Sequence, residues 1–386
     1  MSDFKIGVIG VDRKRRGGHA WPAHCPAKGY RIVSGADINP DALKDFQKEF
    51  GTETFITSDY KEMLKRDLDA VFIMTPDFLH EEQAIAVLEA GVAVYLEKPM
   101  AITIQGCDRI LETAMKTGSK LFIGHNMRHY PAVLKMKEII DSGVIGEVRV
   151  GWCRHFIDYG GVAYFRDWHA EQRYVNGLLL QKGAHDIDVM HWLMGSYTKS
   201  VVGMGSLSVY NQCERRKPDE EPEEWDFNQW PPMEGKGFSP LMDVEDHNML
   251  LMQLENGAQA CYMQCHFTPD SERNYTFIGT KGRLENVGDS GDCEIHVWTQ
   301  RGRRSAPDII HRLSEIPGGH GGSDVGVISS FLDFARHGRP TNTSPVAARQ
   351  AVAAGVMGHD SMREGFQRKD IPVLSADLVE YFDSEK

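Results

Sequence analysis

Short apolar runs alternate with amphipathic stretches through the first third of the chain. Between the runs, apolar positions recur at helical spacing and predict helices over residues 40–50, 59–65, 81–90 and 104–117. The runs themselves are rich in β-branched residues and have the length of buried strands; they cover residues 5–10, 31–37, 69–74, 92–96 and 120–124. This alternation predicts a doubly wound parallel sheet of the Rossmann type, and we assign it to a first domain over residues 1–124.

The pattern changes after residue 124. A helix is expected over residues 132–142, and later helices over residues 325–337 and 347–366. Between them, alternating apolar and polar positions predict strands at residues 200–209, 248–254, 258–267, 274–278 and 294–299. Residues 255–257 form a hairpin turn, and residues 212–240 read as a long polar insertion. We therefore predict a second, α+β domain over residues 125–386 with a large, mostly antiparallel open sheet.

Composition narrows the class of protein. The 386 residues are 41% hydrophobic and 25% charged, as in soluble globular proteins. The formal net charge of −12 argues against binding to nucleic acid or to an anionic membrane. Seven cysteines without a Cys-x-x-Cys pair favour reduced thiols in the cytoplasm. We expect no signal peptide, no membrane span and, because metal-ligand spacing is missing, no metal site.

The first strand ends in a glycine turn that resembles a dinucleotide-binding loop. Gly10 fits the first glycine of G-x-G-x-x-G, whereas Asp12 stands where the second glycine usually allows approach of the pyrophosphate. Asp37 ends the second strand, at the distance where a carboxylate binds the adenosine ribose. That carboxylate favours NAD. The basic run from Arg13 to Arg16 could instead contact a 2′-phosphate or the pyrophosphate, so NADP stays possible.

The strand at residues 92–96 runs directly into Glu97-Lys98-Pro99. Pro99 cannot donate to a sheet and restricts the preceding residue to extended geometry. The strand therefore stops at Lys98, and the ammonium lies at the carboxyl end of the strand, where open α/β sheets bind ligands. An isolated Lys-Pro would be read as a surface lysine, but the nucleotide-binding context makes Lys98 a candidate for catalysis.

Glu97-Lys98-Pro99 resembles the Gfo/Idh/MocA family of glucose-fructose oxidoreductase and inositol dehydrogenase. The resemblance extends over nearly the whole chain. It implies that Glu97 and Lys98 lie beside the cofactor, together with the loop that carries Thr75, Pro76 and His80. From the residues alone, His80 could equally be a helix-start residue without chemistry.

The same resemblance implies a substrate site in the second domain. Residues 176–195 read as one buried helix on which Gln181 and Lys182 share a face with His185. The family has a catalytic histidine at His185 and an aspartate where this chain has Gln181, so Lys182 would take over part of the site. Further substrate contacts are expected from Arg128 and Tyr130 in the link between domains, from Asp186, and from His320 in a glycine-rich loop.

These features predict an NAD(P)-dependent dehydrogenase that acts on a CH–OH carbon of a sugar, glycoside or cyclitol. Lys98 would bridge the substrate hydroxyl and the cofactor ribose, and His185 would be the base with Lys182 assisting. Two alternatives stay open: a nucleotide- and sugar-binding regulator without turnover, and a redox-neutral, NAD-assisted glycoside cleavage. The resemblance also implies a homodimer or homotetramer.

Overall fold

The computed structural model describes residues 3–12, 29–220, 229–289, 293–302, 306–314 and 322–384. The chain divides into two compact units. Unit 1 comprises Met1–Tyr130, Pro317–Arg349 and Val373–Lys386, and unit 2 comprises Pro131–Ile316 and Gln350–Pro372. This division differs from the single predicted boundary after residue 124, because two later segments return to pack with the N-terminal sheet.

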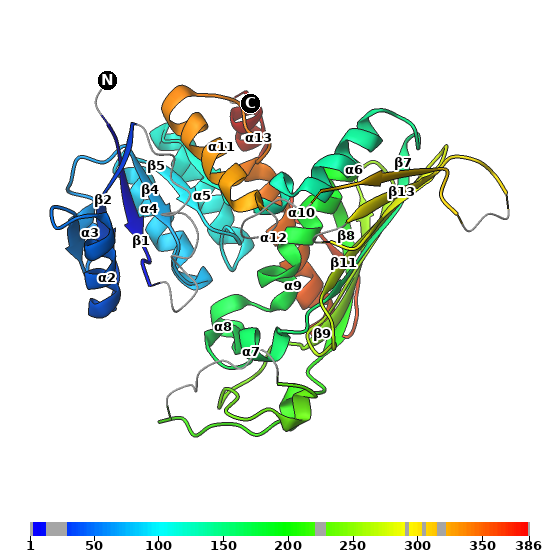
Figure 1. The fold of residues 1–386 in the computed structure, drawn as a ribbon, viewed down its shortest axis with the longest axis horizontal. Helices are drawn as coiled ribbons and strands as arrows, with labels where there is room; N and C mark the ends of the chain where they lie inside the picture. The colour runs from blue at the N-terminus through cyan, green and yellow to red at the C-terminus, as the bar shows by residue number, and fades with distance from the viewer. Residues whose placement is uncertain are drawn as a thin grey trace. The chain divides into compact units, whose positions relative to one another are not determined.

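Unit 1 is built on a six-stranded parallel sheet, sheet A, in the order β3-β2-β1-β4-β5-β6 (Figure 1). This order and the all-parallel pairing confirm the predicted doubly wound arrangement. All six strands point the same way, so the segments that follow β1, β4 and β5 lie along one edge. The strands are β1 (Phe4–Ile9), β2 (Tyr30–Ala36), β3 (Phe55–Thr57), β4 (Ala70–Ile73), β5 (Ala93–Leu96) and β6 (Leu121–Ile123).

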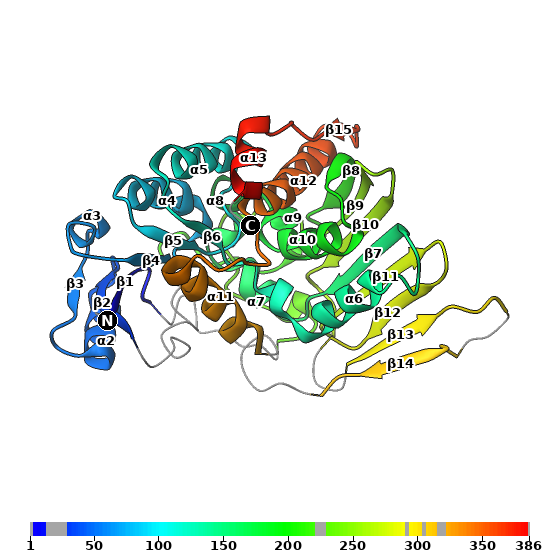
Figure 2. The same cartoon turned by 90° about the horizontal axis from the view of Figure 1, so that it is seen from above.

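Helices cover both faces of sheet A (Figure 2). On one face, Val8, Phe72, Tyr95 and Phe122 form a row in register across four strands, and Phe331 of α11 packs its ring against the last three. The return of α11 therefore seals the apolar core. The helices of the unit are α2 (Pro40–Phe50), α3 (Tyr60–Met63), α4 (His80–Glu89), α5 (Ile104–Thr117), α11 (Ser323–His337) and α13 (Ala376–Ser384), with 3-10 turns at Asp77–Leu79 and Asn126–His129.

Unit 2 contains a nine-stranded sheet, sheet B, in the order β14-β13-β12-β11-β7-β10-β9-β8-β15. Every pair is antiparallel except β7 with β10. The predicted strands are confirmed with shifted ends; β7, β12, β14 and β15 are additional. The strands are β7 (Val148–Phe156), β8 (Thr198–Ser206), β9 (His247–Leu254), β10 (Gln259–Cys265), β11 (Glu272–Gly279), β12 (Arg283–Val287), β13 (Glu294–Trp298), β14 (Ile309–Arg312) and β15 (Lys369–Asp370).

Among the described residues, helices cover one face of sheet B, called here the inner face (Figure 1). They are α6 (Pro131–Asp141), α7 (Gly160–Tyr164), α8 (Gln172–Val175), α9 (Leu178–Gln181), α10 (Gly183–Met194) and, from residue 350 onward, α12 (Pro345–Arg363), with 3-10 turns at Trp168–Ala170, Tyr210–Gln212 and Pro232–Glu234. The outer face exposes apolar side chains, among them Met204, Met249, Leu251 and Trp152.

Over the described residues, no helix is long and apolar enough to cross a membrane. The cysteines in the same ranges carry free thiols, and no group of His, Cys, Asp and Glu side chains there is placed to hold a metal ion.

Candidate active site

The turn after β1 is shaped by a glycine. Gly10 has a φ of 87°, and a Cβ at this position would lie 2.8 Å from the backbone carbon and oxygen of Met74. A side chain is therefore excluded on both conformational and steric grounds. The turn brings the amides of Val11 and Asp12 onto one oxygen of Asp37, at 2.8 and 3.0 Å.

Asp37 lies immediately after β2, as predicted. Its other carboxylate oxygen accepts from the amide of Asn39 at 2.8 Å, and the Asn39 side-chain amide donates to Asp12 at 2.7 Å. The two half-buried carboxylates thus face the turn beside Gly10, the place where a Rossmann sheet holds a dinucleotide. A carboxylate at the end of the second strand is the group with which Rossmann folds bind an adenosine ribose. Arg13 lies outside the described residues.

Lys98 ends β5 at the same edge of sheet A. The Tyr95 hydroxyl donates to one Glu97 oxygen at 3.1 Å, and the Lys98 amide donates to the other at 3.2 Å. Burial raises the pKa of Glu97, while the nearby Lys98 charge acts in the opposite direction. The Lys98–Pro99 peptide bond is cis. Glu97 therefore fixes the backbone at Lys98, and the Lys98 side chain lies half-buried at the strand end.

The side chain of His80 links two loops at this edge of sheet A. Its ring is fully buried, with Nδ1 2.7 Å from the Pro99 carbonyl and Nε2 2.9 Å from the Thr75 carbonyl. Burial lowers the pKa of His80 to about 4, while the hydrogen bonds to the two backbone carbonyls act in the opposite direction. The ring joins the Thr75-Pro76 loop to the loop of Lys98. His80 is also the first residue of α4, as in the reading of a helix-start residue.

The link after β6 is tied to unit 1. Arg128 is buried and donates to the backbone carbonyl of Asn342, and Asn126 donates to Asp324 at 3.2 Å. Tyr130 is half-buried. Arg128 thus has a partner on the backbone inside unit 1. His320 lies outside the described residues.

The predicted single helix over residues 176–195 is wrong in one respect. It is broken at Lys182, which separates α9 from α10. Gln181 and His185 therefore belong to different helices and do not follow the i, i+4 geometry of one continuous helix. Gln181, Lys182 and His185 are all buried, with at most 9% of each residue exposed. The break itself places the Lys182 side chain at a helix start above the inner face of sheet B.

Asp186 has no exposed surface and accepts hydrogen bonds from four side chains. One oxygen accepts from Arg273 at 2.9 Å and from the Tyr275 hydroxyl; the other accepts from Tyr262 and His155, both at 3.0 Å. Burial favours the neutral acid, but Arg273, His155 and the hydroxyls outweigh it and hold the pKa of Asp186 below its ordinary value. Both oxygens are engaged inside the unit, so we infer that Asp186 positions α10.

These partners of Asp186 were not among the residues singled out from the sequence. His155 and Arg273 are register neighbours on β7 and β11, and Gln264 and Asn248 extend the same row across β10 and β9. Each faces inward. On β11, the alternation of inward and outward side chains could have shown that Arg273 faces inward. On β7 the same alternation would not have found His155, because Trp152 is exposed and His155 is buried, the reverse of the usual pattern with apolar side chains inside.

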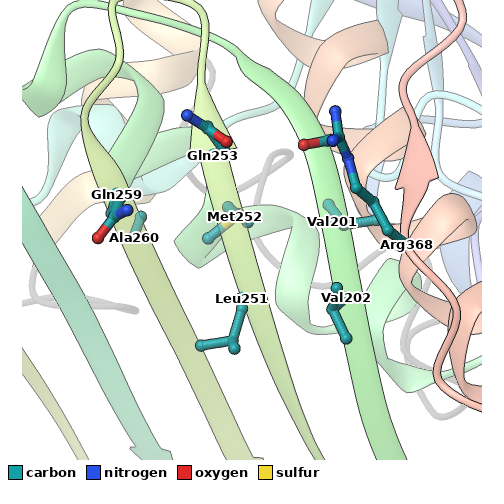
Figure 3. A pocket seen from close by; sticks show the side chains of 9 residues that line it. Val201, Val202, Leu251, Met252, Gln253, Gln259, Ala260 and Arg368 are labelled. Atoms are coloured by element: carbon teal, nitrogen blue, oxygen red, sulfur yellow. The ribbon is translucent and has the colours of Figure 1, made fainter.

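The outer face of sheet B carries a shallow depression of about 290 Å³. Figure 3 shows Val202 and Leu251 on its floor, with Gln253, Gln259 and Arg368 around it. The lining has no general acid or base, since its one ionisable side chain, Arg368, is paired with Asp370 at 2.8 Å. The depression therefore offers binding surface rather than chemistry.

A parallel sheet with a glycine turn after β1 and an acidic residue after β2 is the arrangement of the dinucleotide-binding class of proteins. The family model described as oxidoreductase family, NAD-binding Rossmann fold, matches residues 4–125. The model described as oxidoreductase family, C-terminal alpha/beta domain, matches residues 137–368. The chain belongs to the Gfo/Idh/MocA oxidoreductase family, as its motifs had indicated.

Several known sequences and structures are similar to this chain. A Bacillus subtilis protein with the name "putative oxidoreductase YteT" is 26% identical over 306 residues, 67% of this chain and 70% of that protein. An inositol 2-dehydrogenase/D-chiro-inositol 3-dehydrogenase from Halalkalibacterium halodurans is 30% identical over 200 residues, so the alignment spans 51% of this chain and 55% of the relative. The structure of levoglucosan dehydrogenase with NADH and levoglucosan has a TM-score of 0.78 at 19% identity, over 96% and 100% of the two chains, which shows a common fold.

Family membership confirms the predicted enzyme class, a dehydrogenase acting on CH–OH groups, and the predicted cofactor, NAD.

Proposed function

We propose that this enzyme oxidises one CH–OH carbon of a sugar, glycoside or cyclitol to a carbonyl. Bound NAD supplies the hydride acceptor. The observation that carries the proposal is the position of Lys98, whose backbone amide donates to Glu97, at the sheet edge that also bears the Gly10 turn and Asp37. The names of the inositol and levoglucosan dehydrogenase relatives support the substrate class.

The proposed roles of the candidate residues differ between the two units. Asp37 binds the adenosine ribose, and the Gly10 turn with Asp12 and the loop of Thr75 and Pro76 borders the cofactor. Lys98 binds the substrate hydroxyl and lowers the cost of the developing alkoxide. His185 of unit 2 is the base that takes the hydroxyl proton, with Lys182 assisting. Arg128, Tyr130, Gln181 and His320 are the remaining candidates for substrate contacts.

We propose NAD over NADP because Asp12 and Asp37 place two carboxylates at the turn beside Gly10. A 2′-phosphate would bring further negative charge against them.

A homodimer or homotetramer is proposed on the outer face of sheet B. Met204, Met249 and Leu251 there are each more than half exposed, at 54%, 52% and 58%. Contiguous apolar patches of this kind mark protein interfaces. Free thiols over the described residues fit the proposed cytoplasmic location.

The direct test is a substrate screen with wild type and Lys98→Ala. Purified enzyme with NAD is mixed with myo-inositol, scyllo-inositol, D-chiro-inositol and levoglucosan, and NADH is followed by absorbance. We expect turnover on at least one compound and a loss of about a thousandfold or more in Lys98→Ala, with NAD binding retained. Binding of NAD and sugar without turnover would favour the regulator, whereas product release without net NADH would favour redox-neutral cleavage.

A further inference from the structure

The segment that leads into α9 is held by two side chains of α12. The amide of Leu179, in the first turn of α9, donates to Nε2 of His359 at 3.1 Å, and the guanidinium of Arg363 donates to the carbonyl of Asn176 at 2.7 Å. The first amides of a helix have no partner within that helix, so the imidazole nitrogen acts as a cap supplied by another helix. Residues 176–179 are therefore tied to α12 at both ends.

One carboxylate joins these two side chains. Oε1 of Glu245 accepts from Nε of Arg363 at 3.0 Å, and Oε2 accepts from the same guanidinium at 3.2 Å. Oε2 also lies 3.4 Å from Nδ1 of His359. His359 has no exposed surface and Glu245 is 7% exposed. Because paired N–H···O bonds between arginine and a carboxylate are strong and directional, Glu245 fixes the place of both side chains.

Glycines allow α12 to pack this closely on the segment. A Cβ at Gly177 would lie 2.2 Å from Cε1 of the His359 ring, and a Cβ at Gly355 would lie 3.0 Å from the carbonyl oxygen of Leu179. A larger residue at Gly177 would have to displace a buried ring. The imidazole therefore lies directly against the backbone of the segment.

The segment is hydrogen-bonded to the backbone of the candidate site residues. The amide of Gln181 donates to the Gly177 carbonyl, and the amide of Lys182 donates to the Leu178 carbonyl, both at 3.0 Å. His185 lies in the first turn of α10, which begins directly after Lys182. A shift of the segment is therefore passed through two backbone hydrogen bonds to the break between α9 and α10.

We propose that His359, Glu245 and Arg363 form a positioning triad that sets the orientation of Lys182 and His185 for catalysis. The inference rests on the proposed function, in which His185 is the base and Lys182 assists. The triad acts through the backbone of α9 and takes no part in the chemistry itself. α10 is anchored on sheet B by its own polar contacts, so the break between the two helices is held from both sides. Such support matters because a misplacement of about 1 Å can lower a catalytic rate about a hundredfold.

Two substitutions of His359 separate positioning from packing. His359→Gln can place an amide oxygen where Nε2 accepts from Leu179, whereas His359→Met has a similar length but no comparable acceptor. We expect kcat to fall by about tenfold to a hundredfold in His359→Met and to recover most of this loss in His359→Gln. The Kd of NAD should stay at the wild-type value in both, because Asp37 and the Gly10 turn belong to unit 1.

His191→Met is the matched control. His191 is 2% exposed, and its Nε2 accepts from the amide of Thr198 at 3.2 Å, at the other end of α10. This variant loses the same kind of contact, so its Tm should fall as in His359→Met while kcat stays within about twofold of wild type. Equal losses of kcat in the two Met variants would overturn the proposal, as would a wild-type kcat in His359→Met or a His359→Gln enzyme no better than His359→Met.

Hydrogen exchange tests the triad without turnover. Mass spectrometry follows the backbone amides of wild type, His359→Met and Arg363→Met; the Arg363 side chain is 28% exposed, so the last variant should fold even if His359→Met does not. We expect exchange over residues 177–185 to become about tenfold faster in both variants and to stay unchanged in His191→Met. Unchanged exchange over these residues in both triad variants would overturn the inference. Failure of the wild type on every cyclitol and sugar would instead refute the proposed function.

Discussion

One buried register row across each sheet carries the opposite kind of side chain from the other. Across sheet A, the register row Val8, Phe72, Tyr95 and Phe122 is apolar but for one hydroxyl at its edge, and α11 seals it. Across sheet B, the corresponding inner row is Asn248, Gln264, His155 and Arg273, which carries a full charge and several polar atoms. Both rows are buried in register, yet one is a hydrophobic core and the other a polar network.

The difference concerns where the polar and ionisable side chains of each sheet lie. The faces of sheet A are covered by its apolar core, and its candidate functional groups lie at the strand ends, after β1, β2, β4 and β5. Sheet B has polar groups on the inner face itself. Among the described residues, both amide atoms of Asn248, Nε2 of Gln264 and Nε2 of His266 have no hydrogen-bond partner. Because such groups cost about 1–3 kcal/mol each when buried unpaired, ordered water or a ligand is expected beside them.

The largest expected effect comes from breaking the charge balance of sheet B. Arg273→Met removes the cation that pairs with Asp186 and leaves a buried carboxylate, at a cost of about 3–5 kcal/mol in unfolding free energy. Arg283→Met, on the neighbouring strand β12, removes an arginine that is stacked on Trp298 near the surface and should cost about 1 kcal/mol.

Urea unfolding of both variants measures the difference. Adding Asp186→Asn to Arg273→Met should recover part of the loss. If Arg273→Met were as mild as Arg283→Met, the polar row of sheet B would not depend on its ion pair.

At sheet A, a strand-end change should alter specificity while leaving the fold intact. Asp37→Ala removes a carboxylate from the turn beside Gly10, so the preference for NAD over NADP should fall by a factor of ten or more, about 1.4 kcal/mol. The ratio of kcat/KM for the two cofactors measures it, with Asp45→Ala on α2 as a surface control. An unchanged ratio of kcat/KM values, or a wild type that already prefers NADP, would show that Asp37 does not bind the adenosine ribose.

The smallest expected effect has the opposite sign. Lys182→Met should stabilise the fold by about 1 kcal/mol at neutral pH while it removes turnover. In the folded protein the pKa of Lys182 is lowered, whereas in the unfolded chain it is near 10.5. Between these values only the unfolded chain holds the proton, so wild-type stability falls as pH drops below 10.5.

The Tm advantage of Lys182→Met should therefore shrink as pH approaches 10.5. A Met variant that is less stable than wild type at every pH would mean that the amine contributes to the fold through its contacts with Tyr159 and Tyr164.

Much of sheet A and its site followed from local pattern. Short apolar runs, a glycine turn and the Lys98-Pro99 stop are all written within a few residues, so strand ends and their functional groups could be placed. The return of α11 to this sheet could not be predicted, because nothing in the sequence around Phe331 indicates that its ring packs on Phe72 and Tyr95. Long-range packing of this kind is decided by the whole core.

Sheet B was less predictable for a physical reason. The partners of Asp186 come from β7, β10 and β11, and only strand register brings His155, Tyr262 and Arg273 together. The break at Lys182 was also missed, since buried apolar spacing continues through Leu180, Ile187 and Met190 on either side of it. Residues 182 and 159 are likewise adjacent only in the folded unit.

The central claim is that this chain moves a hydride from a polyol carbon to NAD with Lys98 at the reacting hydroxyl. Wild type and Lys98→Ala are incubated with NAD and with cyclitols or levoglucosan deuterated on every ring carbon, and the cofactor is analysed by mass spectrometry. The account predicts singly deuterated NADH in wild type and almost none in Lys98→Ala, with NAD bound equally by both. Unlabelled, oxidised NAD in the wild type with every compound, or equal labelling in the two proteins, would contradict it.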